Sequence, residues 1–189
     1  MITLRHATIA DLTILQRWDE KEHVIMSDPN DDWHWEIELA RNPAWREQLI
    51  AEKDGRPIGF IQIIDPEEEE THYWGEEVGP NKRAIDIWIG EKEDLGKGYG
   101  TQMMKLALDK CFKNTQVKEV LIDPLESNVK AIRFYERLGF EFVEKRRFDD
   151  EDDCCVYRMR RGIWEVLSRL PRVKKPKGKF FQRWNQKWQ

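Results

Sequence analysis

Two kinds of hydrophobic pattern occur along the chain, and each predicts a different element. Alternating apolar and polar positions, rich in β-branched residues, predict strands at Ile2–Ala7, Gln48–Lys53, Arg56–Ile64 and Arg83–Ile89. Two of these runs are joined by Asp54-Gly55, and an Asp-Gly pair is a strong signal for a two-residue hairpin turn. The first half of the chain therefore predicts a sheet that contains an antiparallel hairpin.

Apolar residues spaced three or four apart predict the helices. The first helix follows Thr8, which can cap it, and carries an apolar stripe of Leu12, Leu15 and Trp18. Further helices are expected at about Asp32–Arg41, Gly98–Lys113, Ser127–Leu138 and Ile163–Leu170, and further strands at Lys118–Asp123, Phe140–Lys145 and Cys154–Met159. The predicted order, β-α-α-β-β-β-α-β-α-β-β, places the chain in the α/β (α+β) class.

The chain divides into a long body and a short tail. Residues 1–170 read as one domain, since a chain of 189 residues is long enough for a single hydrophobic core. Residues 171–189 combine basic with aromatic side chains. Within the body, Asp65–Pro80 is a long acidic loop. Loops of that length are usually functional or disordered, and its aromatic residues favour a function.

Composition narrows the class of protein further. No apolar run approaches the ~20 residues of a membrane span, and Met1–Arg5 reads as a strand rather than a signal peptide. Three cysteines, two of them adjacent, make no disulfide framework, and four histidines show no ligand spacing. We therefore expect a cytoplasmic protein with no metal site and no membrane partner.

Charge is segregated along the sequence, although the net charge is only −4. Acidic clusters occupy Asp28–Asp32, Asp65–Glu70, Glu76-Glu77 and Asp149–Asp153, whereas every charged side chain from Pro171 onward is basic. An acidic body suits a cationic ligand, and a basic tail suits an anionic surface. Each cluster taken alone is also what an ordinary solvated surface presents.

The most informative stretch is Leu95-Gly96-Lys97-Gly98-Tyr99-Gly100-Thr101, between a predicted strand and a predicted helix. Glycines let the backbone approach an anion closely, and the first turn of a helix presents N–H groups to it. The stretch lacks the Gly-Lys-Ser/Thr of a Walker A loop and the third glycine of a dinucleotide-binding loop. It predicts a phosphate cradle of another kind; the alternative is a helix start made of turn glycines.

Two ordered motifs give this cradle a context. The run from Leu95 to Gly100 resembles Gln/Arg-x-x-Gly-x-Gly/Ala, the pyrophosphate loop of the GNAT N-acetyltransferases, and departs from it only at Leu95. The run from Asn128 to Phe140 is similar to the family's Asn-x-x-Ala-x-x-x-Tyr-x-x-x-Gly-Phe. The resemblance covers roughly residues 1–160. It implies a GNAT-type central mixed, mostly antiparallel sheet, flanked by helices and split at the site of acetyl-CoA (coenzyme A).

Within that family the chain looks most like the aminoglycoside 6'-N-acetyltransferases. That subgroup also tolerates leucine at the first loop position. Acyltransferases of siderophore biosynthesis and of ribosomal proteins share parts of the pattern, which leaves a different amine substrate open. The likeness is carried by Ala84-Ile85-Asp86, Leu95–Thr101, Asp123-Pro124, Ser127-Asn128, Ala131-Ile132-Arg133 and Tyr135-Glu136.

Acetyl transfer to an amine needs a base and an acid, and the sequence offers a candidate for each. An alkyl ammonium with a pKa of about 10 must lose a proton before it can attack. Asp86, which interrupts the apolar strand Ile85–Ile89, is the candidate base. By resemblance, Tyr135 is the candidate acid for the departing thiolate. The alternatives are an aspartate on the solvent face of a sheet and a tyrosine packed in the core.

The same resemblance implies a set of cofactor contacts. Backbone groups of Ile87 and Trp88 are expected to pair with pantetheine as an added strand would. Asn128 is expected to bond the same arm, with a helix N-cap as the alternative or additional role. Tyr135 is expected near the sulfur. The pyrophosphate is expected on Gly96, Lys97, Gly98, Tyr99, Gly100 and Thr101, with Lys97 adding charge.

Carboxylates and aromatic rings are expected around the amine substrate, because both attract cations. Asp123 and Asp152 match substrate-contacting positions of the aminoglycoside enzymes, and Asp86 is expected to face the reacting amine. The cleft is expected to be walled by Trp18, Trp74, Glu76 and Glu77. For Trp18, core packing is the alternative.

Three functions fit these observations. The first is a GNAT enzyme that acetylates a primary amine of a small cationic molecule, such as an aminoglycoside, by direct attack, since no cysteine falls in the matched motifs. The second has the same chemistry with a protein, peptide or siderophore-precursor amine. The third is a non-catalytic acyl-CoA-binding module or regulator whose basic tail, Lys174 to Trp188, binds nucleic acid or a partner. Nucleic acid is disfavoured because short tails are more typically flexible or oligomer-forming, which leaves a homodimer open. The presence of both Asp86 and Tyr135 favours an enzyme.

Overall fold

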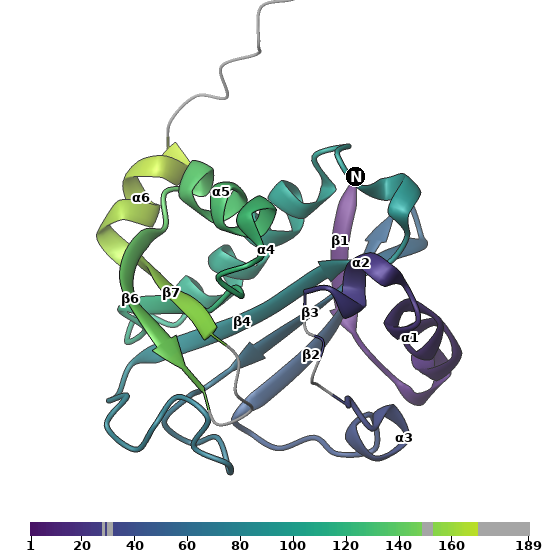
Figure 1. Ribbon diagram of the computed structural model, residues 1–189, viewed down its shortest axis with the longest axis horizontal. Helices are drawn as coiled ribbons and strands as arrows, with labels where there is room; N and C mark the ends of the chain where they lie inside the picture. Colours follow the sequence, from purple (N-terminus) through teal and green to yellow (C-terminus); the bar gives the residue numbers. More distant parts are fainter. Residues whose placement is uncertain (28, 30–31, 149–152, 170–189) are drawn as a thin grey trace, which may run out of the picture.

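Seven strands form one sheet in the order β1-β2-β3-β4-β5-β7-β6 in the computed structural model (Figure 1). The structure describes residues 1–27, 29, 32–148 and 153–169. Neighbouring strands are antiparallel except β4 and β5, which run parallel. The strands are β1 Ile2–His6, β2 Arg46–Lys53, β3 Arg56–Ile64, β4 Lys82–Ile89, β5 Glu119–Ile122, β6 Glu141–Arg147 and β7 Asp153–Arg160.

Helices flank this sheet and, apart from the additional turn α2, follow the predicted order, so the predicted α/β (α+β) class is confirmed. In Figure 1, α1, α2 and α3 gather at one side of the molecule, and α4, α5 and α6 gather at the other. The helices are α1 Leu12–Asp19, α2 Glu22–Ile25, α3 Trp35–Glu38, α4 Tyr99–Lys113, α5 Val129–Leu138 and α6 Arg161–Arg169, with 3-10 turns η1 Ile9–Asp11 and η2 Lys92–Asp94.

The hairpin between β2 and β3 has the predicted two-residue turn. Asp54 and Gly55 adopt φ values of 51° and 82°. Positive φ at both central residues is typical of the turn whose twist matches that of antiparallel strands. Together with a bulge after Ala51, this turn sets the register in which Gln48 lies directly opposite Gln62.

Strand alternation gives the sheet two different faces. On one face, Ile61 of β3 and Ile85 of β4 belong to the cluster that contains Met103 on the apolar side of α4. On the other face, Phe60 of β3 packs in a separate cluster with Trp18 of α1. The sheet is therefore covered on both sides, and its two faces carry different side chains into the centre of the molecule.

The parallel pair β4–β5 is short. Lys82–Ala84 pairs with Glu119–Leu121. From Ile85 to Ile89, β4 stays paired with β3, while its other edge has no strand partner in the described part of the chain. The predicted split in the sheet is thereby confirmed. The carboxyl ends of parallel strands at such an opening are a common place for ligands to bind.

Near the N-terminus the helices are shorter than predicted. The region expected as one helix over Asp32–Arg41 holds only the turn α3. His34 precedes that turn with a left-handed φ of 42°, which breaks the helical path. The additional turn α2 lies where the sequence pattern predicts no helix.

The remaining expectations from the sequence concern the cysteines, membrane spans, metal sites and the C-terminal tail. Cys111, Cys154 and Cys155 are buried and form no disulfide among the described residues. Among the described helices, none is long and apolar enough to cross a membrane. Within the same residues, no group of three or more His, Cys, Asp or Glu side chains is placed to hold a metal ion. The basic tail, residues 171–189, lies outside the described residues, so the domain boundary after residue 170 stays a prediction.

Candidate functional site

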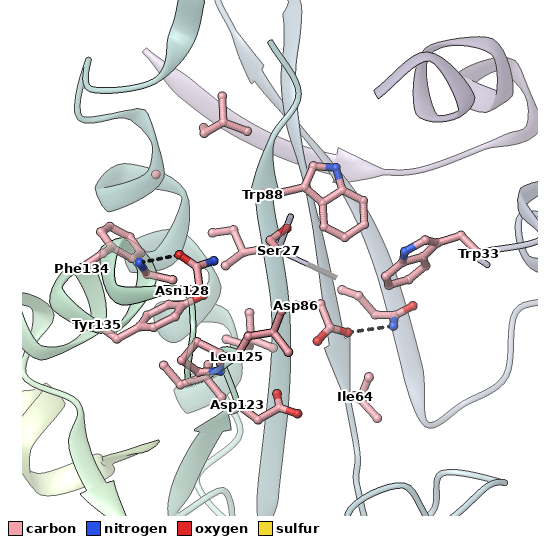
Figure 2. Close-up of a pocket in the computed structure, with 18 of the residues that line it drawn as sticks. Ser27, Trp33, Ile64, Asp86, Trp88, Asp123, Leu125, Asn128, Phe134 and Tyr135 are labelled. Atoms are coloured by element: carbon pink, nitrogen blue, oxygen red, sulfur yellow. Dashed lines mark hydrogen bonds between the residues drawn. The ribbon is translucent and has the colours of Figure 1, made fainter. Parts of the chain in front are cut away.

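A cavity of about 1020 Å³ lies where the sheet splits. Its walls come from β4, the loop before α4, the end of β5 and the first turns of α5, with further residues from the N-terminal helices and the β3–β4 loop. Sites for one small ligand typically measure about 300–1,000 Å³, so this cavity is at the upper end of that range. Figure 2 shows Asp86 at its centre, between Tyr135 and Asn128 on one side and Trp33 and Trp88 on the other.

The loop before α4 has the backbone shape expected of an anion cradle. Gly96 and Gly98 adopt left-handed φ values of 72° and 78°, which favour glycine, and no atom lies within 4 Å of where a Cβ would be. Gly98 is the N-cap of α4, and no side chain among the described residues caps this helix. Its first N–H groups are therefore available to a ligand. Tyr99, Gly100 and Thr101 of that first turn line the cavity, and their contact with a pyrophosphate stays a prediction.

Lys97, the predicted charge of the cradle, is engaged elsewhere. Its Nζ donates to Asp94 Oδ1 at 3.1 Å, and Lys97 is not among the residues that line the cavity. Asp94 is 3% exposed and also accepts two hydrogen bonds from Arg56, at 2.8 and 3.0 Å. The Arg56 hydrogen bonds hold the pKa of Asp94 below its usual value against the opposing effect of burial, and Lys97 adds to this. In this structure Lys97 therefore anchors the loop through Asp94.

The open edge of β4 presents backbone groups of Ile87 to the cavity. The Gly90 N–H donates to the Ile58 carbonyl of β3 at 3.0 Å. In an antiparallel ladder every second residue directs its backbone groups to the same neighbouring strand, so every second residue of β4 before Gly90 also faces β3. Trp88 is one of these, since a Cβ on Gly59 of β3 would lie 2.3 Å from the Trp88 carbonyl oxygen. The predicted backbone pairing with a ligand is thus corrected for Trp88, whose indole lines the cavity instead. The Ile89 carbonyl faces the opening and lies 2.9 Å from a ring nitrogen of His23.

Asp86 lies on the face of β4 opposite α4 and lines the cavity between two hydrophobic clusters. Ala84 on one side of it packs in the cluster with Trp74, and Trp88 on the other side packs against the cluster with Phe60. The Asp86 side chain is half-buried there, so the solvent-face alternative is wrong. Directly across the β3–β4 ladder, Gln62 donates from Nε2 to Asp86 Oδ2 at 3.0 Å (Figure 2).

Tyr135 comes from α5 and faces β4 (Figure 2). It is 8% exposed, and its ring lies 5.7 Å from that of Phe140, so it is part of the core as well as of the cavity wall. Burial raises the pKa of Tyr135 above the usual 10.0, and the negative charges of Asp86 and Asp123 raise it further. The hydroxyl therefore keeps its proton at neutral pH and can act as a proton donor.

Asn128 begins α5 and also lines the cavity. Its Oδ1 accepts from the Ala131 N–H at 3.1 Å, which confirms the N-cap role. The cap uses the carbonyl half of the side chain. The amide NH2 half is a donor that the cap does not require, and a bond from it to a ligand stays a prediction.

The β3–β4 loop contributes aromatic and acidic residues. Tyr73 Oη donates to Asp123 Oδ2 at 2.8 Å, and the Tyr73 ring stacks on Phe148 with centroids 4.3 Å apart. Trp74, predicted for the cleft wall, is 5% exposed, lines the cavity and packs edge-on against Phe148. Glu69 is 7% exposed and accepts from the Tyr73 N–H at 2.9 Å. The loop is thus folded around Glu69 and brings Tyr73 to Asp123.

Sequence reasoning missed many of the cavity residues, and three of them matter most for the chemistry: Trp33, Gln62 and Tyr73. Trp33 stacks on Trp35 with centroids 5.0 Å apart, and its centroid also lies 5.0 Å from that of Trp88. Two tryptophans beside an acidic turn are a pattern that could have indicated Trp33. Nothing in the strand pattern distinguishes Gln62 from an ordinary polar position.

Three predicted substrate residues do not line the cavity. Trp18 is fully buried beneath Gly90, so the core-packing alternative is correct for it. Glu76 and Glu77 are exposed and point elsewhere, because the loop folds around the more buried Glu69. Asp152 lies outside the described residues, and its role stays a prediction.

Comparison with known proteins gives this geometry a family. The acetyltransferase (GNAT) domain family matches residues 8–148. An aminoglycoside N(6')-acetyltransferase type 1 of Klebsiella pneumoniae is 32% identical over 155 residues, which cover 74% of each chain. A probable spermine N(1)-acetyltransferase of Bacillus subtilis subsp. natto is 31% identical over 99 residues, 52% of this chain and 61% of the relative.

A solved structure agrees with the fold. The aminoglycoside acetyltransferase AAC(6')-Ib in complex with coenzyme A and kanamycin superimposes with a TM-score of 0.78 at 28% identity, covering 88% of this chain and 98% of that one. The glycine loop, the open β4 edge and the buried tyrosine occur together on a fold that matches this enzyme. The chain belongs to the GNAT family of acetyltransferases and is an N-acetyltransferase that uses acetyl-CoA.

Proposed function

We propose that the protein acetylates a primary amine of a small polycationic substrate, the 6'-amine of an aminoglycoside, by direct attack. The observation that carries the proposal is a half-buried carboxylate, Asp86, and a protonated tyrosine, Tyr135, facing one cavity with carboxylates and aromatic rings at its other end. The identity to an aminoglycoside N(6')-acetyltransferase supports the choice of amine.

The residues present fit acetyl-CoA. Left-handed Gly96 and Gly98, the uncapped first turn of α4 and the free backbone edge at Ile87 suit a pyrophosphate followed by an amide-containing arm. The cofactor supplies an activated acetyl thioester when bound. Its pyrophosphate is assigned to N–H groups of the loop rather than to the Lys97 side chain.

Asp86 is the proposed base. An ammonium arrives mostly protonated at neutral pH, since its pKa is about 10, and a neutral amine is required for attack. A carboxylate of Asp86 first attracts the ammonium and then accepts its proton. The apolar clusters on either side of Asp86 keep bulk water from competing for that proton.

Tyr135 is the proposed acid. Its raised pKa keeps the hydroxyl protonated throughout the neutral range, and its place opposite β4 suits proton donation to a departing thiolate. Asp86 returns the ammonium's proton to solvent, and the second proton that the attacking nitrogen loses as the amide forms restores Tyr135. The amide product and the thiol then leave an enzyme in its starting state. No step requires a covalent acyl-enzyme.

The acceptor end of the cavity is both acidic and aromatic, which suits an amino sugar. Asp123, held by Tyr73, and Asp32 offer carboxylates to ammonium groups. Trp33 and Trp74 offer ring faces to cations and to the apolar faces of sugar rings. Together these groups match a substrate with several amines better than a single alkyl amine.

A thiol-release assay with acetyl-CoA tests the substrate. Kanamycin-type aminoglycosides, polyamines and short peptides are compared at equal concentration. Release with aminoglycosides that carry a free 6'-amine, lost when that amine is blocked, is the expected result. Release with polyamines or peptides alone would overturn the aminoglycoside assignment and leave the acetyltransferase chemistry in place.

Asp86→Asn tests the mechanism. We expect kcat to fall by about 100-fold or more, because the proton acceptor is lost. The Kd for acetyl-CoA, measured by calorimetry, should stay within about twofold, since Asp86 faces away from the glycine loop. Full turnover in this variant would exclude Asp86 as the base.

A further inference from the structure

Three polar side chains form a line across the sheet beneath the acceptor end of the cavity. Gln48 of β2, Gln62 of β3 and Asp86 of β4 are direct register partners, so all three lie on the face opposite α4. On one side their neighbours along that face, Phe60 and Ile50, are buried and apolar. On the other side β2 presents Arg46, whose positive charge is paired with Glu38. Polar side chains in such surroundings need partners, because an unsatisfied buried polar group costs free energy.

The hydrogen bonds give this line a direction. Gln62 Nε2 donates to Asp86 Oδ2 at 3.0 Å, and Gln48 Nε2 donates to Gln62 Oε1 at 3.2 Å. An ionised carboxylate can only accept, so Gln62 must present its NH2 group to Asp86 and its carbonyl to Gln48. Gln62 is 6% exposed. Its amide cannot turn over without placing carbonyl against carboxylate.

We infer that Gln62 is a positioning residue for Asp86, which fixes the rotation of the carboxylate and favours its ionised form, and that Gln48 holds Gln62 in the required orientation. The inference rests on the proposed role of Asp86 as base. A donated N–H stabilises a carboxylate more than the corresponding carboxylic acid. It therefore opposes the effect of the apolar clusters beside Asp86, which favour the neutral acid.

The competing explanation is a direct contact between Gln62 and the acceptor, since Gln62 also lines the cavity. The two explanations predict different kinetics. A substrate contact acts on the acceptor KM and leaves the pH dependence of the reaction unchanged. A positioning role acts on the pH dependence, because it changes the pH at which Asp86 becomes ionised.

The first measurement is the pH profile of kcat/KM for one aminoglycoside in three variants. Gln62→Met keeps the length of the side chain and removes the donor, and we expect the acid limb to move up by about one pH unit. Gln62→Glu should move it further, because two adjacent carboxylates share a proton. Gln48→Met should move it least. The titration of the substrate's own amine is common to all variants and cancels from the comparison.

The second measurement is a double-mutant cycle with Asp86→Asn. If Gln62 acts through Asp86, Gln62→Met should change the residual rate of Asp86→Asn by less than about twofold. A general structural effect would instead lower the rate by the same factor in both backgrounds. Melting temperature and acetyl-CoA affinity are measured for every variant, and Gln48→Met carries the test if Gln62→Met does not fold.

The outcomes separate this inference from the proposed function. An unshifted acid limb in Gln62→Met, or a raised acceptor KM with kcat retained, overturns the positioning role while Asp86 keeps its own. Full turnover in Asp86→Asn overturns the base assignment, and the positioning role falls with it. A shifted limb together with a non-additive cycle supports both.

Discussion

The two ends of the cavity differ in what they are built from. The donor end consists of backbone groups: the N–H groups after Gly98 and the free edge of β4 at Ile87. The acceptor end consists of side chains, among them Trp33 from the N-terminal region and Tyr73 from the β3–β4 loop. The donor end is encoded by a short run of sequence, whereas the acceptor end is assembled from segments far apart in the chain.

This difference indicates where a substitution can change the substrate specificity of the enzyme. A backbone N–H is present whatever side chain its residue carries, so the donor end tolerates substitution except where a left-handed φ requires glycine. At the acceptor end, each ring or carboxylate contributes individually, and replacing one alters the substrate that fits. Asp86 and Tyr135 lie where the two ends meet, and changes there should affect the chemistry rather than either ligand's affinity.

The largest effect is expected at that meeting point. Tyr135→Phe should lower kcat by about 100-fold, or about 2.7 kcal/mol, because the proton donor is lost while the ring still fills the core. Because the pKa of Tyr135 lies above the usual tyrosine value of 10.0, deprotonation of Tyr135 should not lower the wild-type kcat as the pH rises to that value. Steady-state kinetics across pH measures both. A wild-type kcat that declines with an alkaline limb absent from Tyr135→Phe would show that Tyr135 titrates in this range and contradict its raised pKa.

The second prediction concerns the support of the donor end. Asp94→Asn should lower the free energy of unfolding at pH 7 by about 2 kcal/mol, because the variant loses a buried carboxylate that binds Arg56 and Lys97. Both cations are half-exposed, so the effect is smaller than the loss of a fully buried ion pair. The folded-state pKa of Asp94 is depressed below 3.8, so its contribution exists above that pH and is lost as the pH falls further. Urea unfolding at several pH values should show the gap closing in acid.

The third prediction separates backbone shape from stability at the donor end. Gly98→Ala places a side chain at a φ of 78°, a strain of about 1–2 kcal/mol, and should raise the KM for acetyl-CoA about tenfold. Gly55→Ala is a matched control, with a φ of 82° and equally open surroundings in the β2–β3 turn. It should cost similar stability and leave that KM unchanged. Equal KM values for the two variants would refute a cradle at Gly98.

The smallest effect is expected at the acceptor end. Trp33→Ala removes one ring face and should raise the acceptor KM about fivefold, in line with an exposed cation–π contact, while the KM for acetyl-CoA stays the same. Trp33→Phe keeps a ring and should recover most of the loss. A parallel rise in both KM values would mean that Trp33 supports the whole cavity rather than the acceptor.

The sequence predicted best what depends on local chain geometry. The Asp54-Gly55 turn, the glycine loop and the N-cap at Asn128 follow from short motifs with one backbone solution each. Asp86 and Tyr135 came from motif resemblance, and the structure brings both to the same cavity.

Sequence reasoning did less well with residues whose place depends on tertiary packing. An aromatic residue near carboxylates can face a cleft or the core, and Trp18 takes the core because Gly90 leaves room for its ring. The acidic loop offers several carboxylates, and only the fold shows that Glu69 turns inward. Gln62 gains its role from register with Asp86, which no pattern along a single strand contains.

The edge of β4 that no described strand covers has a thermodynamic consequence. A ligand that pairs with Ile87 binds the folded chain alone, so it stabilises the fold by mass action, by about 2.7 kcal/mol when its concentration is 100 times its Kd. That amount matches the cost of many core substitutions. Acetyl-CoA at a concentration well above its Kd would therefore offset the cost of one destabilising core substitution in this enzyme.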